Sequence, residues 1–263
     1  MSVESGVGVA TPGVKRKVGD PLRERKLDAE MTKRYRMITA RANYMTQDRA
    51  DTMYAVKEVA RGMANPTEAD WQSLKRLARY LKKHPRMVIK YGFQNEPEVI
   101  TIMTDSDYAG CLETRKSTSG GAAKYGGHLL KGWSSTQAVV ALSSGEAEYY
   151  ALVKGTAQAL GIQSMLRDMG VKVGIKLATD STAAMGIAAR TGLGKIRHMD
   201  VQVLWVQRLV RDKRVSVEKI PGVGNGADLM TKSWDQQTLH RLIPDLGLEF
   251  RTGRALSAPE LVV

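Results

Sequence analysis

Residues 98–105 read Glu-Val-Ile-Thr-Ile-Met-Thr-Asp, a strand-like pattern that ends in a carboxylate. A second strand-like pattern at 172–179 is followed in the same way by Asp180. In open α/β sheets, ligands bind at the edge formed by the carboxyl ends of the strands. Because hard divalent cations take oxygen ligands, Asp105 and Asp180 predict a metal site at one edge of a sheet.

Two further carboxylates lie at the starts of predicted helices. Glu146 is in the first turn of a helix predicted over 144–169, and Asp228 is near the start of one predicted over 227–242. Each follows a Ser or Asn by three residues, which is also the spacing of a capping box, and Asp180 could cap the helix after it. Taken singly, each acid is more often a cap than a ligand. Four clustered carboxylates, however, need a cation to be stable together at neutral pH.

The order of the elements around these acids predicts the fold class. Further strand patterns occur at 87–91, 118–125, 127–134 and 214–220, and further helical patterns at 181–190 and 199–212. From residue 98 the order is three strands, a helix, a strand, two helices, a strand and a helix. Hairpins link the first three strands and helices link the later ones. We therefore expect an α/β fold with a mixed sheet flanked by helices.

The chain before this sheet has a helical pattern of its own. Asn65-Pro66 interrupts the pattern, and Thr67 with Asp70 forms a capping box for the next helix. We therefore expect four regions: a linker or truncated end at 1–29, a small helical segment at 30–95, the α/β domain at 96–245, and a flexible tail at 246–263.

Composition restricts the partners and the compartment. The net charge of +13 suits a polyanion such as nucleic acid, because phosphate neutralisation releases counterions. No apolar run approaches the roughly 20 residues that a membrane span needs, so no membrane partner is expected. Cys111 is the single cysteine, which fits a reducing compartment, and residues 1–10 lack a signal-peptide pattern. We expect an intracellular protein, cytoplasmic or nuclear and not secreted.

Seven short motifs follow one another through the predicted α/β domain. They are Thr-Asp-Ser-Asp-Tyr-Ala-Gly (104–110), Arg-Lys-Ser-Thr-Ser-Gly (115–120), Trp-Ser-Ser-Thr-Gln (133–137), Ala-Leu-Ser-Ser-Gly-Glu-Ala-Glu-Tyr (141–149), Thr-Asp-Ser (179–181), Arg-His-Met-Asp-Val (197–201) and Ala-Asp-Leu-Met-Thr-Lys (227–232). This series resembles the ribonuclease H domain of copia-type LTR retrotransposon Pol polyproteins. Upstream, residues 35–80 look like the helical end of the reverse transcriptase in the same polyproteins.

The resemblance implies a ribonuclease H-like fold with a five-stranded mixed sheet flanked by helices. It also implies a metal-dependent endonuclease that hydrolyses the RNA strand of an RNA–DNA hybrid, using two Mg²⁺ ions for which Mn²⁺ can substitute. By motif position, the catalytic and metal-binding acids are Asp105, Glu146, Asp180 and Asp228. Asp107 and Glu148 are close competitors. Asp105 is preferred because it ends the apolar run, and Glu146 because it lies in the first helical turn, with Glu148 roughly opposite.

The implied partners are the RNA–DNA hybrid and the upstream reverse transcriptase region of the same polyprotein. Hydroxyl side chains near the first acid and the third strand are candidates for contacts with RNA 2′-hydroxyls, and basic side chains for contacts with phosphates. The hydroxyl candidates are Ser106, Ser117, Thr118, Ser134 and Ser135; the basic ones are Arg115, Lys116 and Lys131. Ordinary turn and strand chemistry is the alternative for each of them.

Three other functions remain open at this stage. The chain could be a catalytically inactive remnant of the same fold that only binds nucleic acid. It could be an integrase-like strand transferase, but that class carries its glutamate on a late helix. It could also be a tether whose acids merely cap helices.

The loop 221–226 contains no His, unlike the loops of many cellular and retroviral relatives.

Overall fold

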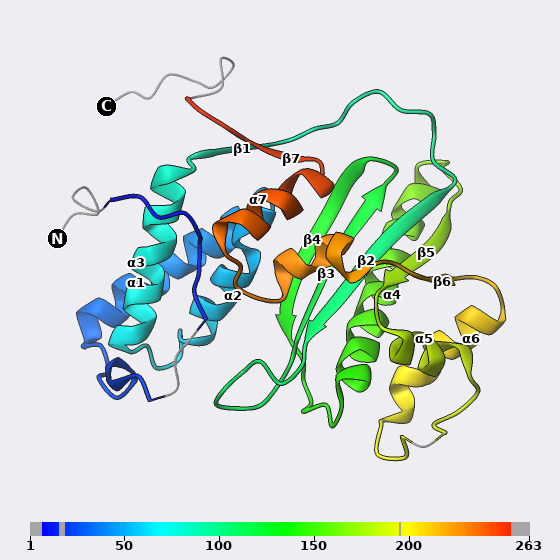
Figure 1. The fold of residues 1–263 in the computed structure, drawn as a ribbon, viewed down its shortest axis with the longest axis horizontal. Helices are drawn as coiled ribbons and strands as arrows, with labels where there is room; N and C mark the ends of the chain where they lie inside the picture. Colours follow the sequence, from blue (N-terminus) through cyan, green and yellow to red (C-terminus); the bar gives the residue numbers. More distant parts are fainter. Residues whose placement is uncertain (1–6, 16–18, 195, 254–263) are drawn as a thin grey trace.

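The computed structural model describes residues 7–15, 19–194 and 196–253, so parts of the expected linker and tail lie outside the described residues (Figure 1). The helices are α1 (Ala29–Met45), α2 (Met53–Arg61), α3 (Glu68–Lys83), α4 (Ser144–Asp168), α5 (Thr182–Ala189), α6 (Trp205–Arg211) and α7 (Gln236–Asp245). The strands are β1 (Arg86–Ile89), β2 (Val99–Asp107), β3 (Thr118–Tyr125), β4 (His128–Thr136), β5 (Gly174–Thr179), β6 (Ser216–Lys219) and β7 (Leu248–Arg251). Short 3₁₀ helices include η4 (Val201–Leu204) and η6 (Gly226–Met230).

Five strands form a mixed sheet in the order β4-β3-β2-β5-β6. Strands β2, β3 and β4 pair antiparallel through hairpins, whereas β5 and β6 add in parallel after helical crossovers. The expected α/β class and the order of elements from residue 98 are therefore confirmed. Strand β2 lies in the centre, and the parallel register pairs Met103 with Ala178. This register brings the residues that follow both strands to the same edge.

Helices cover both faces of the sheet (Figure 1). On one face, α4 and the α5–α6 pair bury Ile100 and Ile102 of β2 in a single apolar cluster. On the other face, η6 and α7 cover Ala122 and Leu129, with Met103 packed against them. This arrangement follows from the strand period of two, which sends alternate residues of β2 to opposite faces.

Two glycines allow helices to approach the central strands closely. A Cβ atom on Gly155 of α4 would lie 2.5 Å from Cγ2 of Thr104, and one on Gly120 of β3 would lie 2.5 Å from Cγ2 of Thr231. Real Cβ atoms do not tolerate such separations, so both positions need glycine. The two contacts place α4 and η6 directly against the strand end that carries Asp105.

The helical segment before the sheet has its own small core. Val56, Leu74 and Leu77 from α2 and α3 pack together with Tyr35 of α1. The predicted capping box at the start of α3 is present: Asp70 accepts a hydrogen bond from the Thr67 amide at 3.0 Å. The Thr67 hydroxyl accepts one from the Asp70 amide at 3.4 Å.

This helical segment is also joined to the sheet. Met53 and Tyr80 belong to the same apolar cluster as Ala122 and Leu229. Lys57 of α2 donates a hydrogen bond of 2.8 Å to the hydroxyl of Thr118 on β3. The helical segment and the sheet therefore share one apolar cluster, in addition to the small core that the helices form among themselves. The domain boundary near residue 95 stays a prediction.

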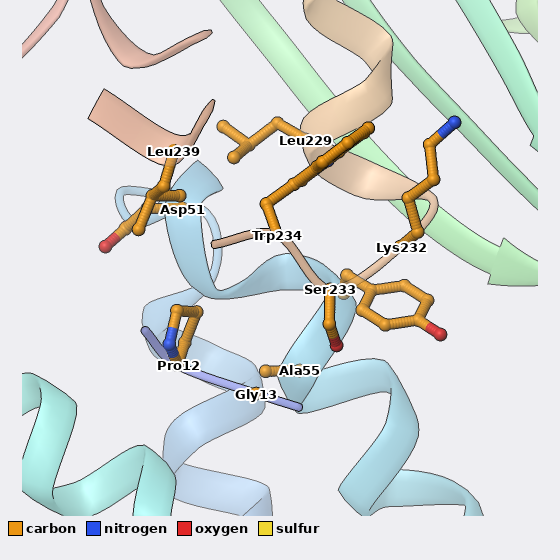
Figure 2. A pocket seen from close by; sticks show the side chains of 10 residues that line it. Pro12, Gly13, Asp51, Ala55, Leu229, Lys232, Ser233, Trp234 and Leu239 are labelled. Carbon is orange, nitrogen blue, oxygen red and sulfur yellow. The ribbon is translucent and has the colours of Figure 1, made fainter. Parts of the chain in front are cut away.

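The described parts of the expected linker and tail are ordered against the rest. Thr11 is buried and its hydroxyl accepts a hydrogen bond of 2.7 Å from Arg76, while Pro12 and Gly13 lie beside α2 (Figure 2). At the other end, β7 pairs antiparallel with β1, and Leu246 and Leu248 are buried. The expectation of a flexible tail is wrong for 246–251, because these apolar side chains close the cluster under α7.

The helix predicted over 227–242 is also divided in the structure. Asp228 lies in η6, and a second helix, α7, begins after Asp235, whose carboxylate caps it by accepting from the Thr238 amide at 2.8 Å. Between them, the indole of Trp234 donates to the carbonyl of Asp228 at 2.8 Å. The single predicted helix is therefore two helices, and Asp235 caps the second one.

Candidate metal centre

Three carboxylates from distant parts of the chain meet at the carboxyl edge of the sheet. They belong to Asp105 near the end of β2, Glu148 on α4 and Asp180 directly after β5, and one oxygen of each lies within 4.8 Å of the others. The strand pairing explains the meeting, since Asp105 and Asp180 each lie two residues beyond the paired Met103 and Ala178. Both strand-end aspartates are therefore where the sequence pattern places them.

Glu148, and not Glu146, completes this group. The carboxylate of Glu146 accepts hydrogen bonds from the Leu142 amide at 3.0 Å and pairs with Nε2 of His198 at 2.8 Å. Glu148 lies two residues further along α4, about 200° around the helix axis. Its Oε1 accepts from the Ser106 amide at 3.2 Å. The preference for Glu146 is thus not supported by the geometry, because the helix face that meets the sheet is the one that carries Glu148.

Asp228 lies on the other side of Asp105. The ammonium of Lys232 is 2.8 Å from Oδ1 of Asp228 and 3.7 Å from Oδ2 of Asp105, so it links the two acids. The hydroxyl of Thr231 donates a short hydrogen bond to Asp105. Three of the four acids expected from the sequence therefore gather here, with Glu148 in place of Glu146.

Two buried amide side chains fix the elements that carry these acids. The Nδ2 of Asn225 donates to the carbonyl of Thr104 at 2.9 Å, which holds the start of η6 against β2. The Nε2 of Gln137 donates to the carbonyl of Ala147 at 2.8 Å and to the hydroxyl of Ser119 at 3.0 Å, which ties α4 to the sheet. The sequence interpretation gave Gln137 no role, and its only signal was its place at the end of the motif 133–137.

Asp107, the alternative to Asp105, is hydrogen-bonded within the sheet instead. Its carboxylate accepts a short hydrogen bond from the Thr118 amide on β3. Burial raises the pKa of Asp107 to about 6 against the lowering effect of that amide and of nearby Lys57. The geometry therefore supports Asp105 as the member of the acidic group.

The electrostatics of the group are those of a site that favours a cation. Burial, followed by the charges of Asp105 and Asp180, raises the pKa of Glu148 to about 9. Burial and the neighbouring Asp105 raise the pKa of Asp228 to about 7, and the same two causes raise the pKa of Asp180. Each carboxylate thus resists ionisation beside the others, and a bound divalent cation would remove that penalty.

These pKa shifts predict that the metal-free protein becomes less stable as pH rises from about 4 to 9. Unfolded carboxyl groups lose their protons near pH 4, whereas Glu148 and Asp228 retain theirs to about pH 9 and 7 in the folded chain. The folded state therefore binds more protons in this window, and stability falls with pH. Melting temperatures in EDTA at pH 5, 7 and 9 measure the effect. The slope should flatten in Glu148→Gln, and an equally steep slope in that variant would contradict the assignment.

The hydroxyl residues expected near the first acid are mostly occupied within the protein. Ser106, Ser117 and Thr118 are buried, and their hydroxyls accept from Gln137, from the Ala109 amide and from Lys57, respectively. Ordinary strand and turn chemistry therefore accounts for all three, which corrects the expectation that they face RNA. Ser135 accepts a hydrogen bond from Lys154 and remains half-buried, as does Ser134.

The basic candidates are better placed for phosphate contact. Arg115 and Lys131 are exposed, and Lys116 is half-buried. A groove of about 950 Å³ also opens between helices α2 and α3, the described chain at 12–15 and 19–23, and the loop after β2. Its lining is of mixed charge, with the basic Arg61, Arg76, Arg79 and Lys232 and the acidic Asp20, Glu58, Asp107 and Glu113. The four acids do not line the groove; Lys232, which pairs with Asp105 and Asp228, lies between the groove and the acidic group.

The chain was compared with known proteins, and no protein-family model matches it. It is 29% identical over 190 residues to the retrovirus-related Pol polyprotein from transposon TNT 1-94 of Nicotiana tabacum, covering 72% of this chain. It is 26% identical over 219 residues to the retrovirus-related Pol polyprotein from transposon RE1 of Arabidopsis thaliana, covering 81% of this chain. Curated homologues of the chain are therefore Pol polyproteins of copia-type retrotransposons.

The chain spans only a small part of these relatives, 14% of the TNT 1-94 polyprotein and 15% of the RE1 polyprotein. A third relative, the secreted RxLR effector protein 161 of Plasmopara viticola, is 34% identical over 116 residues. That match covers 44% of this chain and 81% of the effector. No described helix of the chain has both the length and the apolar composition needed to cross a lipid bilayer.

Solved structures similar to this chain include the N-terminal RNase H domain of rv2228c from Mycobacterium tuberculosis. It is 12% identical with a TM-score of 0.35, over 55% of this chain and 95% of that one. Another is LC11-RNase H1 in complex with an RNA/DNA hybrid, 17% identical with a TM-score of 0.33, over 50% and 93% of the two chains. The sheet itself confirms the expected ribonuclease H-like class, with five mixed strands between helical layers.

Proposed function

We propose that this chain is a metal-dependent ribonuclease H that hydrolyses the RNA strand of RNA–DNA hybrids within a retrotransposon Pol polyprotein. The observation that carries the proposal is the meeting of Asp105, Glu148 and Asp180 at the carboxyl edge of the sheet, in a chain similar to retrotransposon Pol polyproteins. A stable fold gains nothing from three clustered carboxylates unless a cation joins them.

The proposed ligands are Asp105, Glu148, Asp180 and Asp228. Their donor atoms are all carboxylate oxygens, which fit Mg²⁺ and also Mn²⁺, and no sulfur or imidazole is among them. When bound, a pair of such ions supplies an activated water and stabilises the oxygen that leaves the RNA phosphorus. The protein's own part is to hold the four carboxylates in place, through Thr231 on Asp105 and the Ser106 amide on Glu148.

Substrate binding is proposed to use the basic surface around this edge. Arg115, Lys116 and Lys131 would contact phosphates, and the groove lined by Arg61 and Arg76 would take one strand of the hybrid. Helices α2 and α3 form one wall of that groove, which supports the upstream reverse transcriptase region as a partner. Net charge of +13 favours such a polyanionic ligand.

The test is a cleavage assay of the chain alone on a defined, end-labelled RNA–DNA hybrid. We expect cleavage of the RNA strand with Mg²⁺ or Mn²⁺, and none in EDTA, because the carboxylates cannot activate water without an ion. Duplex DNA of the same sequence is the matched control and should stay intact. Cleavage of duplex DNA would favour a strand-transferase function. Hybrid binding without cleavage would favour a catalytically inactive nucleic-acid-binding remnant.

A further inference from the structure

The side chain of Lys232 takes part in the acidic group as a cation. Its ammonium lies 2.8 Å from Asp228 and 3.7 Å from Asp105. The same nitrogen lies 5.0 Å from the ring centroid of Trp234, an arrangement that also favours a positive charge. Figure 2 shows Lys232 and Trp234 on the chain that follows η6, with the lysine nitrogen directed away from Ser233.

The oxygens of the group divide around Asp105 into two sets. Asp105, Glu148 and Asp180 lie within 4.8 Å of one another and could share one ion. The other set is Asp105 with Asp228, and the ammonium of Lys232 lies between these two carboxylates. A divalent ion bound by the second set would therefore have to share or take the position that Lys232 now holds.

Local geometry holds Lys232 at this position and also allows it to leave. The preceding residue, Thr231, is buried and anchored to Asp105, so the backbone of Lys232 is fixed beside the site. The lysine side chain itself is 40% exposed, in contrast to 5% for Asp105. Partly exposed ion pairs are readily exchanged, whereas the carboxylates stay in place.

We propose that the ammonium of Lys232 fills the second cation position of this site, so that a second divalent ion binds only by displacing it. This inference rests on the proposed function, because it concerns the same four acids. It predicts one tightly bound ion, on Asp105, Glu148 and Asp180, and a second ion that binds at least about tenfold more weakly. Lys232 thereby sets the ion concentration at which the site becomes doubly occupied.

The experiment counts Mn²⁺ ions bound to the full chain at pH 7.5, by titration calorimetry and by the electron paramagnetic resonance signal of free Mn²⁺. In Lys232→Met, the second ion should bind on the order of tenfold or more tightly than in the wild type, because a competing unit charge is gone. Lys232→Arg keeps the charge and should leave the second ion weak. Lys172→Met removes an exposed lysine before β5, at the end of the sheet opposite the acids, and should behave as wild type.

Each outcome decides the matter. Equal affinities for the second ion in wild type and Lys232→Met overturn the inference, and Lys232→Gln replaces the methionine variant if that variant does not fold. A wild-type chain that binds Mn²⁺ and cleaves hybrid, while Lys232→Met changes nothing, refutes this inference alone. A wild-type chain that binds no Mn²⁺ refutes the proposed function and this inference with it.

Discussion

Replacing Glu148 by glutamine is expected to reduce Mg²⁺-dependent hybrid cleavage by more than about 100-fold, whereas Glu146→Gln should retain it within about tenfold. Loss of a residue that only hydrogen-bonds to a metal ligand already lowers metal affinity or activity by about 10- to 100-fold. Glu148 is proposed as a ligand itself, so its loss should cost more. Glutamine keeps the oxygen that accepts from the Ser106 amide, so Glu148→Gln should fold. Glu146 is occupied by Leu142 and His198, on the far side of the same helix.

The pair of variants provides its own control, since each removes one carboxylate near the start of α4, at positions two residues apart on roughly opposite faces. Initial cleavage rates on one labelled hybrid, at saturating Mg²⁺, give the comparison. Hybrid affinity in Ca²⁺ or EDTA should be similar for both variants, which separates binding from chemistry. If Glu146→Gln lost activity and Glu148→Gln kept it, the assignment drawn from the structure would be reversed.

Asp180→Asn should abolish Mg²⁺-dependent cleavage while hybrid binding in EDTA stays largely intact. Asp180 lies against Asp105 and Glu148, and its charge contributes to the raised pKa of Glu148. Removing that charge should therefore also raise the melting temperature of the metal-free protein, because repulsion within the group decreases. Loss of activity with a gain in stability is the expected signature of a functional carboxylate.

Asp212→Asn is the matched control for this variant. Asp212 is exposed at the end of α6, where it pairs with the exposed Arg208 and Arg211. Neither activity nor melting temperature should therefore change appreciably. Cleavage rates and melting temperatures in EDTA are measured on both variants beside wild type. Full activity in Asp180→Asn would remove Asp180 from the site.

The two strand-end aspartates could be predicted from the sequence because a strand has a simple period. The apolar run before Asp105 places this residue near the end of β2, which continues to Asp107, and parallel pairing with β5 brings Asp180 to the same edge. The helix glutamate was harder to predict. Glu146 and Glu148 are both buried or half-buried on α4, and only the way in which α4 packs on β2, through Gly155, decides which one faces the edge.

The remaining misjudgements have a similar cause in tertiary contacts. The tail was expected to be flexible because a four-residue strand such as β7 has no local signal until β1 pairs with it. Ser117 and Thr118 were candidates for RNA contact because of their place in the sequence near the first acid and the third strand. In the structure their partners are Ala109 and Lys57, the second of which lies in another part of the chain.

The ribbon formed by β1 and β7 has a mechanical consequence. β1 follows α3, and β7 is the last strand described, so their hydrogen bonds join the helical segment to the C-terminal end of the described chain. Because Tyr80 of α3 and Leu229 of η6 also belong to one apolar cluster, hinge motion between the helices and the sheet would expose apolar surface. A force applied to the helical segment would therefore be transmitted to the acidic edge of the sheet.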